Sequence, residues 1–183
     1  GSEMCIRDRN NQEVGLLASG AGTTLTASDL TVSGTSSREI DGLFGGGVYA
    51  LEGANLQLVR TEVSDNHHVG LAAFGEATKV LGSSLVVKQT RAAGCADAGT
   101  CKDSGVGVFC EQASCRLVEF NLAANDFCGL VLKAAEETES WSTEWFLAQR
   151  GIITDNLIGV DIQLGYFNPI ESLIDVYNYG NIE

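Results

Sequence analysis

The sequence predicts an all-β protein built as a solenoid of about six stacked coils. A unit that opens with glycine recurs along the chain, spaced 23 residues from Gly47 to Gly70 and 22 from Gly107 to Gly129. Apolar residues alternate within the units, as at Leu56 and Leu58, and this period of two indicates strands. The chain also has 22 glycines and 1 proline among 183 residues, which favours many short turns. Together these features favour β structure throughout.

Each unit has the same order of elements. A glycine precedes a short apolar strand, a polar corner follows, and a second strand leads to an Asn/Asp turn before the next glycine. We expect the opening glycines to mark turns. Polar insertions lengthen three units, near residues 36–46, 91–104 and 133–142, and residues 134–150 are the one candidate helix. The opening glycines are Gly15, Gly47, Gly70, Gly107, Gly129 and Gly159.

Asparagines recur at the end of the units. Asn66, Asn125 and Asn156 each adjoin an aspartate shortly before the next opening glycine. Asparagine tolerates a left-handed backbone and bonds to its own turn. Stacked coils would bring these amides into register, so we expect hydrogen bonds along the solenoid axis and a structural role.

The cysteines indicate local disulfides. Cys95 and Cys101 flank one small polar loop, and Cys110 and Cys115 flank another. Both spacings can close a disulfide, although spacing alone does not prove the pairing. Reduced structural cysteines and a metal site are the alternatives, but cysteine pairs that bind zinc are normally separated by fewer residues. Disulfides would imply an oxidising, extracytoplasmic compartment.

The charge restricts the class of partner. The formal net charge is −13, which argues against nucleic acid, because phosphate binding needs clustered Lys and Arg. The sequence also lacks an apolar stretch of ~20 residues that could span a membrane. The acidic residues either form a solvated surface or bind calcium, which is the one cofactor that we consider.

The repeated units carry a resemblance to a known family. Gly-(Val/Leu)-x-(Ala/Cys/Leu/Ile), followed by apolar residues and Asn/Asp before the next glycine, resembles the right-handed parallel β-helix family. That family includes pectate-lyase-like enzymes and repeat-rich surface or secreted bacterial proteins. The resemblance covers about Gly15 to Tyr179 and implies a single-stranded β-helix with stacked Val, Leu, Ile and Ala inside. An antiparallel β-sandwich is the main rival.

The chain then divides into two parts. Residues 1–9, GSEMCIRDR, resemble a translated sequencing adapter and are expected to be non-native. Residues 10–183 are expected to be a fragment of a β-helix domain carrying the three insertions. The natural parent would be longer, with any signal peptide outside this fragment.

Candidate catalytic residues are few. Lyases of the resembled family use carboxylates with calcium, and a basic residue that removes a proton. Here Asp65 and Asp126, with Arg60, are the candidates, and neither a lyase set nor a glycosidase pair aligns cleanly in the repeat. Glu62 and Asp155 are further acids on stacked coils.

Two other groups have a possible binding role. Trp141 and Trp145 can form a platform for sugar rings, or can pack the insertion against its coil. Consecutive strand residues face opposite sides, so His67 and His68 do not bind one metal from a regular strand, and we interpret them as turn residues.

Function is therefore predicted in outline only. The first hypothesis is a non-enzymatic β-helical scaffold or adhesive segment of a secreted or cell-surface bacterial protein, with a polysaccharide or cell-surface glycan as partner. The alternative is a fragment of a carbohydrate-active enzyme, a polysaccharide lyase or a glycoside hydrolase. The sequence leans against an enzyme, because it offers no complete catalytic set.

Overall fold

The protein is an all-β structure with parallel sheets. The computed structural model describes residues 7–37, 45–92, 104–133, 140–141, 146–163, 166–167 and 174–180. All regular elements in these residues are strands, so no helix among them is long and apolar enough to cross a membrane. The expected helix over 134–150 is wrong at its end, because residues 146–150 belong to a strand. Its residues 134–139 and 142–145 lie outside the described ranges.

One sheet contains six short strands in parallel register. Its order is β14-β11-β9-β7-β5-β2, so neighbours in space are one unit apart in sequence. The strands are β2 (Val14–Ser19), β5 (Gly46–Leu51), β7 (Val69–Phe74), β9 (Val106–Glu111), β11 (Cys128–Lys133) and β14 (Ile158–Gln163).

The second sheet contains eight strands and is also parallel. Its order is β1-β4-β6-β8-β10-β13-β16. The eighth strand, β3, pairs with the first part of β6, and β4 pairs with the last part. The strands are β1 (Arg7–Arg9), β3 (Thr24–Ser28), β4 (Thr31–Ser33), β6 (Asn55–Ser64), β8 (Lys79–Lys88), β10 (Ser114–Ala123), β13 (Phe146–Thr154) and β16 (Ile174–Tyr179).

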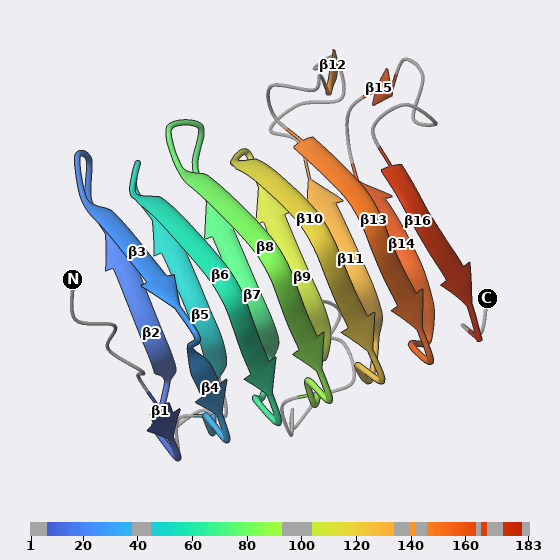
Figure 1. Ribbon diagram of the computed structural model, residues 1–183, viewed down its shortest axis with the longest axis horizontal. Coiled ribbons are helices and arrows are strands. Elements are labelled where there is room, and N and C mark those ends of the chain that lie inside the picture. The colour runs from blue at the N-terminus through green and yellow to red at the C-terminus, as the bar shows by residue number, and fades with distance from the viewer. Residues whose placement is uncertain are drawn as a thin grey trace.

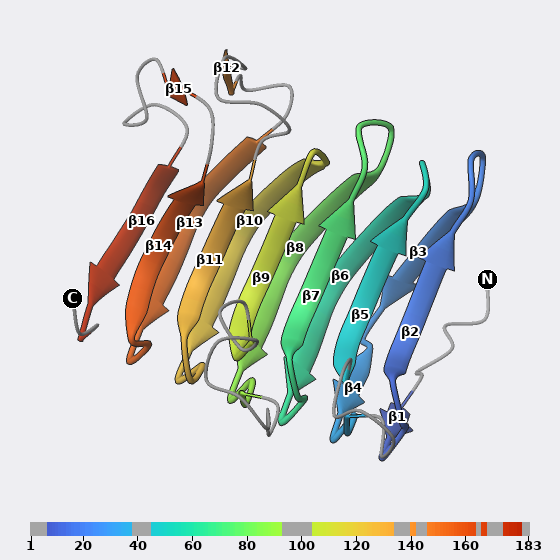
Figure 2. The same ribbon diagram turned by 180° about the vertical axis from the view of Figure 1, so that it is seen from behind.

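The chain alternates between the two sheets. We call a strand of the six-stranded sheet and the strand of the eight-stranded sheet that follows it a rung. The sheets lie face to face, and their strands run in opposite directions (Figures 1 and 2). Each strand pairs with its counterpart in the next rung, which is compatible with a parallel β-helix-like fold. A small separate pair, β12 (Ser140–Trp141) and β15 (Tyr166–Phe167), lies above the upper ends of the strands in the last rungs (Figure 1).

The long strands bend once, at a residue with a left-handed backbone. In β6 this residue is Arg60, at φ 49°, with equivalents at Ser84, Glu119 and Arg150. Leu58 and Thr61 are buried on either side of the bend, so the inward-facing positions shift by one residue there. The bend therefore lets both halves of the strand face the same core, which strict alternation would not allow.

The core lies between the sheets as rows of like residues. Val48, Leu71, Val108 and Leu130 occupy one row of the six-stranded sheet, in direct register from rung to rung. All four are at most 1% exposed. Because each row repeats one kind of side chain at the strand spacing of ~4.8 Å, apolar surface is buried continuously along the stack.

The opening glycines do not mark turns, which corrects the expectation from sequence. Each is the second residue of a short strand, and none has a positive φ. A Cβ on Gly47 would lie 2.7 Å from the carbonyl oxygen of Gly70, and a Cβ on Gly70 would lie 2.7 Å from that of Gly107. Glycine is needed here because the backbones of neighbouring rungs approach too closely for a side chain.

Candidate functional site

The turns after strands of the eight-stranded sheet hold the three predicted asparagines and two of the three candidate catalytic residues. We call them the asparagine edge: the row Thr35, Asn66, Thr90, Asn125 and Asn156, with the residues directly before and after each. The residue before each row member has a left-handed backbone, such as Asp65 at φ 54°. This conformation turns the chain sharply and directs the next side chain inward.

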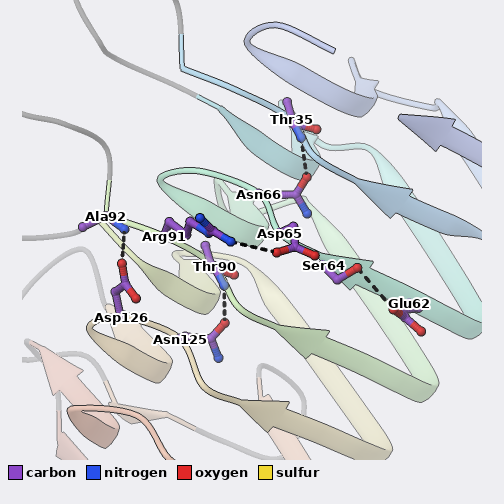
Figure 3. Close-up of polar contacts among 10 residues, drawn as sticks. All are labelled: Thr35, Glu62, Ser64, Asp65, Asn66, Thr90, Arg91, Ala92, Asn125 and Asp126. Atoms are coloured by element: carbon purple, nitrogen blue, oxygen red, sulfur yellow. Dashed lines mark hydrogen bonds and ion pairs between the residues drawn. The ribbon is translucent and has the colours of Figure 1, made fainter. Parts of the chain in front are cut away.

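The row members form hydrogen bonds from rung to rung (Figure 3). The amide N–H of Thr35 donates to Asn66 Oδ1 over 3.0 Å, and that of Thr90 donates to Asn125 Oδ1 over 3.1 Å. Asn125 donates to Asn156 Oδ1 from both its backbone and its side chain, over 3.0 and 2.9 Å. All five row members are at most 2% exposed, so these bonds satisfy buried groups that water does not reach.

Two members of this row could not be recognised from the sequence. Thr35 and Thr90 stand where an asparagine stands on the other rungs, and neither threonine adjoins an aspartate. Only their position could have identified them, because each is a polar residue that follows an alternating strand. Their residue type gives no such indication. The Oγ1 atoms of both threonines are buried with no hydrogen-bond partner among the described residues.

Asp65 and Asp126 lie at the asparagine edge, but on rungs separated by the β8 rung. Asp65 is paired with Arg91 over 3.3 Å, and Asp126 Oδ2 accepts the backbone N–H of Ala92 over 2.9 Å (Figure 3). Two rung spacings correspond to about 10 Å along the stack. The two carboxylates therefore contact the same turn, the one after β8, but each makes its own contact there, with adjacent residues.

Arg60 lies elsewhere, at the bend of β6. Its guanidinium donates two hydrogen bonds of 2.6 Å to Asp29 on the neighbouring rung. The hydrogen bond from Arg60 lowers the pKa of Asp29. Five residues of extended chain, about 16 Å, separate Arg60 from Asp65, so the structure does not bring the three candidate catalytic residues together.

The other acids and the histidines are also engaged in local contacts. Glu62 accepts from Ser64 Oγ and pairs with Lys88 over 3.2 Å. His67 Nδ1 lies 3.5 Å from Ser37 Oγ, and the backbone N–H of His67 donates to Thr35 O. Within the part of the chain that the structure describes, no three His, Cys, Asp or Glu side chains are placed to hold a metal ion. The calcium hypothesis therefore rests on acidity alone.

The candidate tryptophans can be placed only in part. Trp141 ends β12, where its backbone is in register with Phe167 of β15. Trp145 falls outside the described ranges. A sugar-binding platform at these two residues stays a prediction from sequence.

Cys110 and Cys115 form a disulfide in the core. Cys110 ends the inward row of β9 and Cys115 begins that of β10, so the bond spans the two-residue turn between the sheets. Cys95 and Cys101 lie outside the described ranges. Cys128 is a free buried thiol, and burial raises its pKa to about 12, so it stays protonated at neutral pH.

The disulfide should stabilise the turn measurably. We expect the double substitution Cys110→Ala/Cys115→Ala to lower the free energy of unfolding by about 2–4 kcal/mol, because the unfolded chain gains the freedom of an open loop. Urea denaturation without reductant measures this. Cys128→Ala is the matched control, since it removes a buried sulfur without a cross-link, and should cost about 1 kcal/mol. Equal losses in the two proteins would contradict a stabilising disulfide.

Comparisons of the chain with protein-family models, with curated proteins and with solved structures found no match.

Proposed function

We propose that the chain is a right-handed, single-stranded parallel β-helix that serves as a non-enzymatic scaffold or adhesive segment of a secreted or cell-surface bacterial protein. Two observations support the fold. The chain alternates between two parallel sheets, and each strand pairs in register with the equivalent strand of the next rung. The core disulfide is weakly consistent with secretion. A glycan at the cell surface is the proposed partner.

One observation carries the non-enzymatic assignment. The groups with catalytic potential each make a contact between rungs: Asp65 with Arg91, Asp126 with the backbone of residue 92, and Arg60 with Asp29. A general base or a nucleophile must instead reach the reacting atom, close to its partner groups. Side chains held in separate structural contacts suit a scaffold better than a catalytic centre.

An activity assay tests the proposal. We expect no cleavage of uronate polymers or neutral polysaccharides, with calcium or with chelator, when unsaturated products and reducing ends are measured. Asp65→Ala should lower the free energy of unfolding by less than about 1 kcal/mol, because its ion pair is exposed. Asp126→Ala should cost about 1 kcal/mol, for one hydrogen bond.

Turnover by the wild-type chain that either substitution abolishes would overturn the scaffold assignment. It would favour the alternative, a fragment of a polysaccharide lyase or glycoside hydrolase. Buffer, heat-denatured protein and the charge-matched variant Glu76→Ala, an exposed acid distant from the asparagine edge in its rung, are the controls.

A further inference from the structure

We propose that one outward face of the eight-stranded sheet binds a carboxylated glycan. This face, which we call the carboxylate-free face, consists of the outward-facing positions in the segments 24–28, 55–59, 79–83, 114–118 and 147–149. These segments are β3 and the parts of the long strands that precede the bend. The inference rests on the proposed adhesive function and gives it a location.

The face differs in charge from the rest of the molecule. The chain carries 24 acidic residues and a net charge of −13, yet these five segments contain no Asp or Glu. They contain two cations, Lys79 on β8 and Arg116 on β10, and both are exposed. A positive, acid-free area on an acidic protein is complementary to a ligand with carboxylates.

Lys79 and Arg116 also differ from the other cations. Every other Lys and Arg whose side chain the structure describes is in an ion pair with a carboxylate of a neighbouring strand; these are Arg60, Lys88, Arg91, Lys133 and Arg150. Among the same described side chains, neither Lys79 nor Arg116 makes an ion pair. These two cations therefore remain available for an external anion.

The register places the two cations together. Lys79 is opposite Ser114, and Arg116 is two residues further along β10 on the same face. A strand spacing of ~4.8 Å and a two-residue rise of ~6.6 Å give a separation of about 8 Å between their Cα atoms. One carboxylate between these side chains would offset the repulsion of two like charges.

The surrounding groups suit a sugar chain. Asn55, Gln149 and the half-buried Gln57 offer amide donors and acceptors for hydroxyl groups. Leu81, which lies between Gln57 and Arg116 in register, is 37% exposed and offers an apolar contact for ring C–H groups. The face thus combines the three kinds of contact that an acidic sugar chain can use.

A glycan is favoured over other anionic macromolecules. Duplex DNA carries one charge per ~1.7 Å, and a protein of net charge −13 repels such a dense polyanion. A glycan with sparse carboxylates can present one charge at Lys79 and Arg116 and neutral hydroxyls elsewhere. Charges more than about 8 Å away are screened at physiological salt, so the acidic remainder of the protein opposes such a ligand only weakly.

The test compares two polymers with one backbone. We measure binding of the full chain to immobilised carboxymethyl-dextran and to unmodified dextran by biolayer interferometry. We expect binding to the carboxymethylated polymer that weakens when salt rises from 50 to 500 mM, because the recognition is electrostatic. Binding to unmodified dextran should be at least tenfold weaker. Circular dichroism and the urea midpoint verify that each variant is folded.

Two double variants locate the site. Lys79→Gln/Arg116→Gln should weaken binding to carboxymethyl-dextran at least tenfold. Lys88→Gln/Arg150→Gln changes the net charge equally, removes cations that already have carboxylate partners, and should weaken binding less than twofold. Equal weakening by both variants would overturn the assignment, because bulk charge would then explain the binding.

Other outcomes separate the two proposals. If the wild type ignores carboxymethyl-dextran but binds another polysaccharide on a panel, the adhesive function stands and the carboxylate-free face is wrong. If it binds no glycan, both fail. If poly-L-glutamate binds as tightly, and the Lys79→Gln/Arg116→Gln variant loses it too, the face recognises acidic peptides and the glycan assignment is overturned.

Discussion

Replacing Gly107 by alanine should lower the free energy of unfolding by about 3 kcal/mol, at the upper end of the usual cost of overpacking. The new Cβ would lie 2.7 Å from the carbonyl oxygen of Gly129 on the next rung and 2.8 Å from Asn125 Nδ2. A side chain in this position could rotate away, but the Gly129 oxygen belongs to the backbone of β11. That strand is paired with β9 on one side and β14 on the other. The clash between the new Cβ and this oxygen can therefore be relieved only if the two rungs move apart.

Urea denaturation followed by circular dichroism measures the loss. Gly22→Ala is the matched control, because no atom lies within 4 Å of the new Cβ and only its left-handed backbone, at φ 82°, opposes the change. Gly22→Ala should lower the free energy of unfolding by about 1 kcal/mol. A Gly107→Ala protein as stable as the control would mean that the rungs can separate locally at little cost, and the close-approach explanation for the glycine row would be wrong.

Replacing Asn125 by alanine should cost a similar amount, about 3 kcal/mol. The substitution removes the acceptor for the buried N–H of Thr90 and the side-chain donor to Asn156 Oδ1. An unsatisfied buried donor costs about 1–3 kcal/mol in addition to the lost bonds, because water does not reach it. The position is 1% exposed, so no solvent replaces the amide without local opening.

Asn121 provides the comparison for this second substitution. It lies on β10, the strand that precedes the turn of Asn125, and its Oδ1 is buried without a hydrogen bond from any described residue. Asn121→Ala therefore removes an unsatisfied acceptor and should change the free energy of unfolding by less than about 1 kcal/mol in either direction. Chemical denaturation of the two variants side by side gives the difference. Equal costs would show that the amide row contributes nothing beyond ordinary packing.

These two substitutions also show which features the sequence could predict. The glycine positions were found from their recurrence, yet their expected role in turns was wrong. Recurrence shows that a position is constrained, but the constraint here is the carbonyl of another rung. Similarly, Asn66, Asn125 and Asn156 were found by residue type, whereas Thr35 and Thr90 were missed because threonine at a strand end is unremarkable in sequence.

The candidate site was predictable to a lesser extent. Asp65 and Asp126 do lie at one edge, but the β8 rung separates them, and Arg60 lies at the bend. Insertions of unequal length change the sequence distance between equivalent positions, so spacing alone does not give the register. The isolation of Lys79 and Arg116 was equally hidden, because it depends on which carboxylates lie opposite the other cations.

The sequence by itself determined the all-β character, the repeated unit and the polar turn row, because alternation, glycine recurrence and Asn/Asp turns are local properties of the chain. Only the tertiary structure decided the bend in each long strand, the reason for the glycines, the partners of each charged group and the face that lacks carboxylates. Each of these depends on a contact with a neighbouring rung at ~4.8 Å, between residues more than twenty positions apart in sequence.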